Sequence, residues 1–110
     1  MKAYEIRYCN FKHNTAYDKK EVGDSHLQDT KPRPVCILFT NKVVSTVIPL
    51  TSKNTKRTDL DTHIVIGEDM LLLEQITTVP TSVLDKKLFK KQFTEDEKTE
   101  IKNAIKALLD

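Results

Sequence analysis

The chain has 110 residues, of which 18 are Lys or Arg and 16 are Asp or Glu, so its formal net charge is +2. This length is enough for one hydrophobic core, and we interpret residues 1–110 as a single domain. No apolar run reaches the roughly 18 residues of a membrane span. The first residues, MKAYEIRYCNF, lack the apolar stretch of a secretory signal, so we expect a protein that is not exported.

The cysteines and histidines match no metal or redox pattern. Cys9 and Cys36 are far apart, and Cys36 lies in an apolar run, where a thiol behaves as a small buried hydrophobe. We therefore expect a reduced, cytoplasmic protein. His13, His26 and His63 stand at no ligand spacing, so we predict no metal site and no cofactor. The chain also lacks a GxSxG nucleophile motif and a Gly-rich phosphate loop.

The N-terminal half predicts three strands. Residues 4–11, YEIRYCNF, alternate as a strand does, and residues 12–30 form a polar loop of a length that is usually functional or mobile. The apolar runs at 35–39 and 43–50 are typical of a hairpin that turns at residues 40–42. Because proline cannot donate a hydrogen bond to a strand ladder, we expect the second hairpin strand to end, or to meet an edge, at its proline.

The C-terminal half predicts two further strands and a helix. Strands are expected at 62–66 and 70–79, after a polar loop at 51–61, and a short helix with a connector is expected at 85–91. Thr94-Glu95-Asp96-Glu97 is a capping box that starts the terminal helix. Its apolar residues follow at helical spacing: Ile101, Ala104, Ile105, Leu108 and Leu109. The sum is a mainly β protein, a small barrel or curled sheet with a C-terminal helix.

Polar chemistry is expected at the ends of the hairpin. Arg33 is held between two prolines, which fix the backbone from which its guanidinium extends toward, for example, a phosphate. Antiparallel pairing predicts that Arg33 lies beside Thr51, whose hydroxyl would complete an oxyanion clamp. Spacing alone favours a plain surface arginine and a common strand-end threonine. His26 is the histidine best suited to proton transfer, although a solvated loop residue is the simpler interpretation.

Two basic stretches have similarly open interpretations. Lys53, Lys56 and Arg57 could follow an RNA backbone, or they could form an ordinary solvated loop. The lysines of residues 86–91 allow the same two interpretations. With no Trp and only seven Tyr and Phe residues, the chain offers few rings on which bases could stack.

Several segments, taken in chain order, resemble the MazF/PemK family of toxins from bacterial toxin–antitoxin systems. They are an Arg-Pro-Val strand start, Pro-Leu-Thr-Ser-Lys, Thr-His-Ile-Val-Ile, LLLEQITTVPTSVLDKK and the capped helix. The resemblance implies an SH3-like small β-barrel of the MazF, PemK and CcdB type, usually a homodimer. It also implies a cognate antitoxin protein that blocks the binding groove of the toxin.

The activity that the resemblance implies is that of a sequence-specific, metal-independent endoribonuclease acting on single-stranded RNA, commonly mRNA. Cleavage through the neighbouring 2′-hydroxyl would leave a 2′,3′-cyclic phosphate and a 5′-hydroxyl. The family's catalytic arginine falls on Arg33, and its partner hydroxyl falls on Thr51. The candidate RNA-binding residues are Gln28, Ser52, Lys53, Lys56 and Arg57.

Two positions depart from the family pattern. Ala3-Tyr4-Glu5 stands where many members have Gly-Asp, and Gln28 stands where several have a glutamate. Because Gln28 cannot act as a base, either His26 takes that role or Arg33 and Thr51 act with water alone.

Two alternatives to the ribonuclease interpretation stay open. Barrels of this type include non-enzymatic toxins that bind a protein such as DNA gyrase, in which case the C-terminal helix is the expected contact. A phage-defence RNase restrained by an RNA antitoxin would share the barrel. The Arg33 and Thr51 pair favours the nuclease, and the fit of residues 74–79 favours a protein antitoxin, whose acidic segment could fold onto the basic loops.

Overall fold

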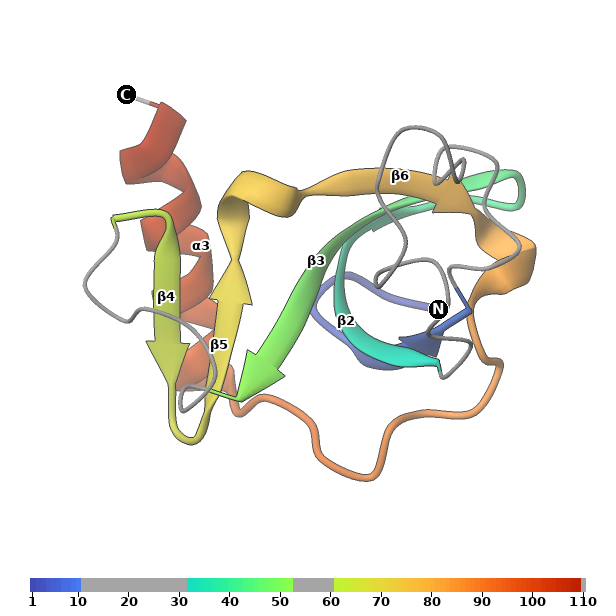
Figure 1. Ribbon diagram of the computed structural model, residues 1–110, viewed down its shortest axis with the longest axis horizontal. Coiled ribbons are helices and arrows are strands. Elements are labelled where there is room, and N and C mark those ends of the chain that lie inside the picture. Colours follow the sequence, from blue (N-terminus) through green and yellow to red (C-terminus); the bar gives the residue numbers. More distant parts are fainter. Residues whose placement is uncertain (11–31, 53–60, 110) are drawn as a thin grey trace, which may run out of the picture.

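The computed structural model describes residues 1–10, 32–52 and 61–109. Within these ranges the elements are β1 (Ile6–Cys9), β2 (Arg33–Thr40), β3 (Val44–Ser52), β4 (His63–Ile66), β5 (Asp69–Leu72), η2 (Leu73–Gln75), β6 (Thr77–Pro80), η3 (Thr81–Val83) and α3 (Glu95–Leu109). The strands form one curled antiparallel sheet, and α3 lies beside β4 and β5 (Figure 1). The predicted fold class, mainly β with a C-terminal helix, is confirmed, with six described strands instead of about five.

The sheet is built around β3. Its first part pairs with β2 along one edge and with β6 along the other, and its last residues pair with β5, which in turn pairs with β4. We expected this strand to end or to meet an edge at Pro49; β3 continues to Ser52, but its ladder with β2 stops at Pro49 and its partner changes. The ladder with β2 stops at the pair Val35↔Pro49, and the ladder with β5 starts at Leu50↔Leu71. The missing N–H of Pro49 coincides with this change of partner.

Both faces of the central strands are buried. Side chains alternate between faces along a strand, so Val35 and Ile37 enter one apolar cluster while Cys36 enters the other. The first cluster also contains Cys9, Val47, Val79 and Leu84. The second contains Ile6, Ile48, Leu50, Ile66, Leu71, Leu73, Phe93 and Ile101. Two-sided burial explains the unbroken apolar run of β2, and it confirms that Cys36 is buried.

The predicted single strand at 70–79 is two strands with a turn between them. The four residues of β3 from Val47 to Leu50 are matched by seven on the facing segment, from Leu71 to Thr77. The 3₁₀ turn η2 takes up this excess. Because a flat strand could not absorb it, the chain bends here, and the sheet curls.

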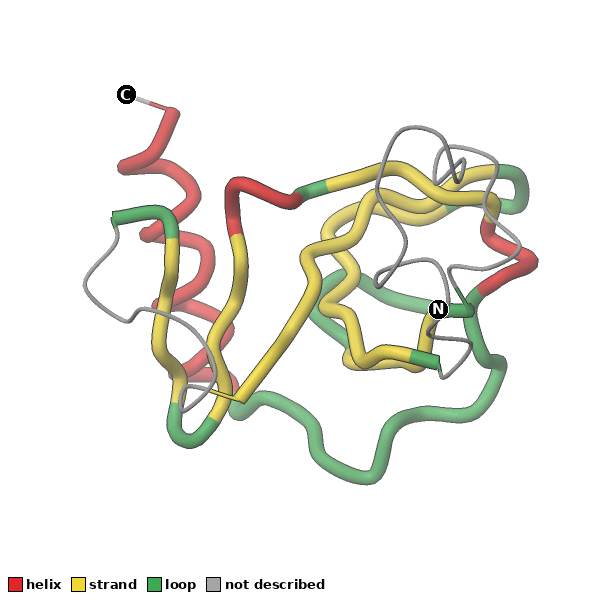
Figure 2. The backbone as a smooth tube through the Cα atoms, viewed as in Figure 1, coloured by secondary structure: helices red, strands yellow, loops and turns green. Residues whose placement is uncertain are grey.

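The short helix that we predicted at residues 85–91 is wrong. After Val83, the chain is a loop that crosses from η3 to α3, and we call residues 84–94 the crossing loop (Figure 2). Its N–H groups bond to β1: Asp85 donates to the carbonyl of Tyr8 at 2.9 Å, and Phe89 donates to that of Ile6 at 3.1 Å. In a helix over residues 85–91 the N–H of Phe89 would donate to the carbonyl of Asp85, so its bond to Ile6 takes the place of a helical bond.

The helix α3 begins as predicted. Thr94 Oγ1 accepts from the N–H of Glu97 at 3.1 Å, and Glu97 Oε1 accepts from the N–H of Thr94 at 2.9 Å, which confirms the capping box. Of the predicted apolar face, Ile101 is buried, whereas Leu108 and Leu109 are 43% and 80% exposed. The last turn extends past β4 and therefore has no sheet beneath it (Figure 1).

We predict that the Tyr4→Gly variant is more stable than the Tyr4→Ala variant, the reverse of their usual order of stability, because the backbone at Tyr4 is strained. Tyr4 has a φ of +66°, a left-handed conformation that costs a residue with a side chain about 1 kcal/mol. Its ring packs against the core, so Tyr4→Ala and Tyr4→Gly both lose that contact. Only Tyr4→Gly also relieves the backbone. In urea unfolding it should be the more stable of the two by about 1 kcal/mol, and an Ala variant of equal or greater stability would contradict the prediction.

Candidate functional site

Arg33 and Thr51 both lie at strand ends. Arg33 is the first residue of β2, it is exposed, and it is paired with Cys9 of β1. The prolines on both sides restrict its backbone, so the guanidinium starts from a fixed point. Thr51 is half-buried and is followed by the exposed Ser52, the last residue of β3. Each residue is therefore carried by a paired strand.

Strand pairing does not set Arg33 opposite Thr51, although the hairpin register would do so if it continued. The ladder between β2 and β3 stops two residues earlier, at Val35↔Pro49. Beyond that point β2 pairs only with β1, while β3 pairs with β5, and Thr51 lies opposite Met70. Figure 1 shows the two strands diverging. The two residues thus stand at separate strand ends, where β2 and β3 have diverged.

An ion pair offsets a negative charge near the end of β3, beside Thr51. Asp69 pairs with Ser52 across the ladder, and Lys91 Nζ donates to Asp69 Oδ2 at 2.8 Å. The hydrogen bond to Asp69 raises the pKa of Lys91 above its usual value, so the lysine stays protonated. Because Lys91 offsets the carboxylate, an anionic ligand near Ser52 meets less repulsion than Asp69 alone would cause.

The crossing loop is fastened to β1 by a buried arginine. Arg7 Nη1 donates to the backbone carbonyls of Asp85, at 3.0 Å, and of Lys86, while its Nε and Nη2 donate to Glu5 Oε1 at 3.2 and 3.0 Å. Its side chain is only 8% exposed. Gln92 adds a second attachment, because its side chain both accepts from the N–H and donates to the carbonyl of Ile6, each at 2.9 Å.

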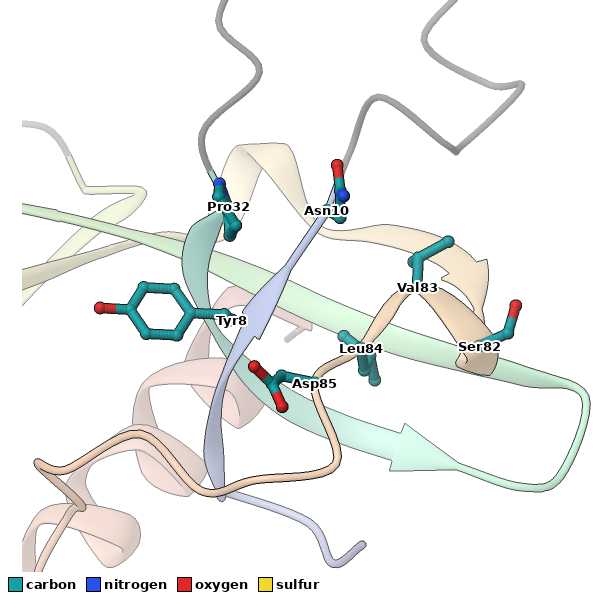
Figure 3. Close-up of a pocket in the computed structure, with 7 residues that line it drawn as sticks. All are labelled: Tyr8, Asn10, Pro32, Ser82, Val83, Leu84 and Asp85. Atoms are coloured by element: carbon teal, nitrogen blue, oxygen red, sulfur yellow. The ribbon is translucent and has the colours of Figure 1, made fainter.

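A shallow pocket of about 260 Å³ lies where β1 meets the crossing loop and the start of β2. Figure 3 shows the ring of Tyr8 and the carboxylate of Asp85 on one side of it, Ser82 on the other, and Asn10 and Pro32 at the top. The ring of Tyr8 contacts Phe89 edge-on, with centroids 4.9 Å apart. Pro32 directly precedes Arg33, so the pocket adjoins the strand end that carries the arginine.

The sequence identified neither Arg7 nor this pocket as functional. The available signal for Arg7 was a charged residue two positions before Cys9, on the same face of the predicted first strand. Asp85 carried no signal, because its position depends on where the crossing loop meets β1.

The remaining predicted site residues lie outside the described part of the chain: His26, Gln28, Lys53, Lys56 and Arg57. Among the residues that the structure does describe, no group of three or more His, Cys, Asp or Glu is placed to hold a metal ion. Burial raises the pKa of both Cys9 and Cys36 to about 12, which keeps these thiols protonated and makes them poor nucleophiles. No described helix has the length and apolar character that crossing a membrane requires.

Comparison with known families identifies the chain. Residues 2–109 match the family described as PemK-like, MazF-like toxin of type II toxin–antitoxin systems. Because the match covers nearly the whole chain, the protein belongs to this toxin family, and the resemblance inferred from its motifs is confirmed. Membership implies an antitoxin as partner. A search of curated proteins finds no match to the chain.

We predict that Arg7→Lys loosens the crossing loop. Lysine keeps the positive charge but cannot bond to two carbonyls and a carboxylate at once, so the variant should lose about 2 kcal/mol of unfolding free energy. Brief trypsin digestion followed by mass spectrometry should show faster cleavage after Lys86, Lys87 and Lys90, with cleavage within α3 as the internal control. Unchanged cleavage at the three loop lysines would show that Arg7 does not hold the loop.

Proposed function

We propose that this toxin is a sequence-specific, metal-independent endoribonuclease that cleaves single-stranded RNA. The observation that carries the proposal is an exposed arginine at the first residue of β2, fixed by its prolines, in a chain that belongs to the PemK-like toxin family. A guanidinium in this position can bind two phosphate oxygens and stabilise the charge that develops during cleavage. Thr51, near the end of β3, supplies a hydroxyl donor.

In the proposed reaction, the 2′-oxygen of one nucleotide attacks the adjacent phosphorus, and the bond from phosphorus to the 5′-oxygen breaks. The 2′-hydroxyl gives its proton to His26 or to water, and the leaving 5′-oxygen takes a proton from Arg33 or from water. Arg33 and Thr51 hold the phosphate oxygens in the pentacoordinate state. The products are a 2′,3′-cyclic phosphate and a 5′-hydroxyl, so no metal and no cofactor enter the proposed scheme.

The proposed surroundings of the site follow the same chemistry. Ser52 at the end of β3 would bind the RNA, together with Gln28, Lys53, Lys56 and Arg57. Positive charge along the RNA path supplies most of the affinity for the phosphate backbone and makes binding salt-dependent. We further propose a cytoplasmic homodimer that is restrained by a protein antitoxin with an acidic segment, since the family is one of type II systems.

A second candidate function is that of a non-enzymatic toxin that binds a protein target such as DNA gyrase. The observation that favours it is the last turn of α3, which exposes Leu108 and Leu109 beyond the sheet. Exposed apolar side chains at the end of a helix suit contact with another protein. In this case Arg33 and Thr51 would have no role in the toxicity.

The two functions are separated by a cleavage assay on a long single-stranded RNA in excess EDTA. We expect discrete cuts by the wild type, a loss of on the order of a hundredfold or more in rate for Arg33→Ala, and a clear loss for Thr51→Ala. Lys102→Ala, an exposed lysine of α3, is the matched control for a loss of positive charge and should cut like the wild type.

Folding of each variant is checked by thermal unfolding, so that a loss of rate is not a loss of structure. Intact RNA with folded wild-type protein would overturn the nuclease and favour the protein-binding toxin. Cuts that persist unchanged in Arg33→Ala would overturn the assignment of the arginine alone.

A further inference from the structure

The pocket between β1 and the crossing loop has the features of a site for one nucleobase. The ring of Tyr8 is 38% exposed, and its edge contact with Phe89, at an interplanar angle of 85°, fixes its orientation. An aromatic ring of this kind can stack on any base. The volume of about 260 Å³ lies below the roughly 300–1,000 Å³ of pockets for drug-sized ligands, so it suits a single planar group.

The polar groups of the pocket distinguish between bases. Asp85 Oδ1 accepts the N–H of Lys87 at 2.9 Å, which fixes the carboxylate in place. An ionised carboxylate can only accept hydrogen bonds, so it pairs with the exocyclic amino group of cytosine, adenine or guanine. Uracil has no exocyclic amino group, and its one donor, the ring N3–H, lies between two partially negative carbonyl oxygens that a carboxylate would repel. The amide of Asn10 both donates and accepts, so it can bond to any of the bases.

The surroundings of the pocket suit a nucleic-acid strand. Lys86 and Lys87 are exposed on the crossing loop directly after Asp85, where they can bind the phosphates that flank a base. Arg7 ties the backbone of this same stretch to β1, so these side chains start from a fixed position. Pro32 places the pocket one residue from Arg33 along the chain.

We propose that this pocket holds one base of the RNA beside the cut, and that Asp85 selects a base with an exocyclic amino group over uracil. The inference rests on the proposed function, and it adds a specificity-determining residue to it. Tyr8 supplies stacking, which is the same for all bases, and Asp85 supplies the discrimination.

The first test compares the cut sites of the wild type and Asp85→Asn in a long RNA, mapped by sequencing the cleaved ends. Asparagine keeps an oxygen for the N–H of Lys87, but its amide can also donate to uracil. The wild type should disfavour uracil at one position beside the cut by about fivefold to tenfold, and Asp85→Asn should lose this preference. Asp96→Asn, an exposed carboxylate of α3, is the matched control and should keep the wild-type profile.

The second test measures binding without cleavage, so that it does not depend on the nuclease activity. Fluorescence anisotropy with the Arg33→Ala variant should show tighter binding of short oligoadenylate or oligocytidylate than of oligouridylate. Adding Asp85→Asn should remove the difference, and adding Tyr8→Leu should weaken binding of all three about equally.

The outcomes of the two tests separate the two proposals. A wild type that cuts no RNA overturns the proposed function, and the binding assay alone then decides whether the pocket holds a base. A wild type that cuts, with the same base profile in Asp85→Asn, overturns the inference and leaves the nuclease intact. Binding that does not depend on Asp85 or Tyr8 overturns the inference as well.

Discussion

The change of partner along β3 is the constraint on which the rest of the structure depends. The strand holds β2 and β6 with its first residues and β5 with its last three, and the ladder with β2 ends at Pro49, which has no N–H to donate. This break lets β1 and β2 curl away from β4 and β5. It leaves Arg33 at the start of β2 and Thr51 near the end of β3, on strands that have separated, so the placement of both residues follows from the change of partner.

The crossing loop places polar and charged groups next to the start of β2, since Asp85 and Pro32 line the same pocket. Hydrogen bonds from Arg7 and to the carbonyls of β1 hold the loop in an extended path, which keeps Asp85 beside Tyr8 and directs lysines outward. The ion pair of Lys91 with Asp69 offsets a carboxylate near Ser52. The described residues thus place cationic and hydrogen-bonding groups around strand ends that a flat sheet would leave bare.

Features set by neighbouring residues could be predicted from the sequence, and features set by distant ones could not. The capping box at Thr94 and the hairpin turn, where Asn41 Oδ1 accepts the N–H groups of Val43 and Val44 at 2.8 Å each, depend on a few adjacent residues. The crossing loop instead depends on a partner 78 residues away, since Arg7 binds the carbonyl of Asp85. This distant partner is not visible in the local sequence, where Leu88 and Phe89 lie among lysines, and that local pattern suggested a helix.

The central claim is that the RNA's own 2′-hydroxyl attacks a phosphate held by Arg33 and so cleaves the RNA strand. It is tested most directly by removing that hydroxyl. A short RNA with one mapped cut site is prepared with a single 2′-deoxynucleotide on the 5′ side of the scissile phosphate, and its twin carries the deoxy substitution one position away. The account predicts no cleavage of the first RNA and normal cleavage of the twin. Equal cleavage of both would mean that water attacks the phosphorus, and it would contradict the proposed mechanism.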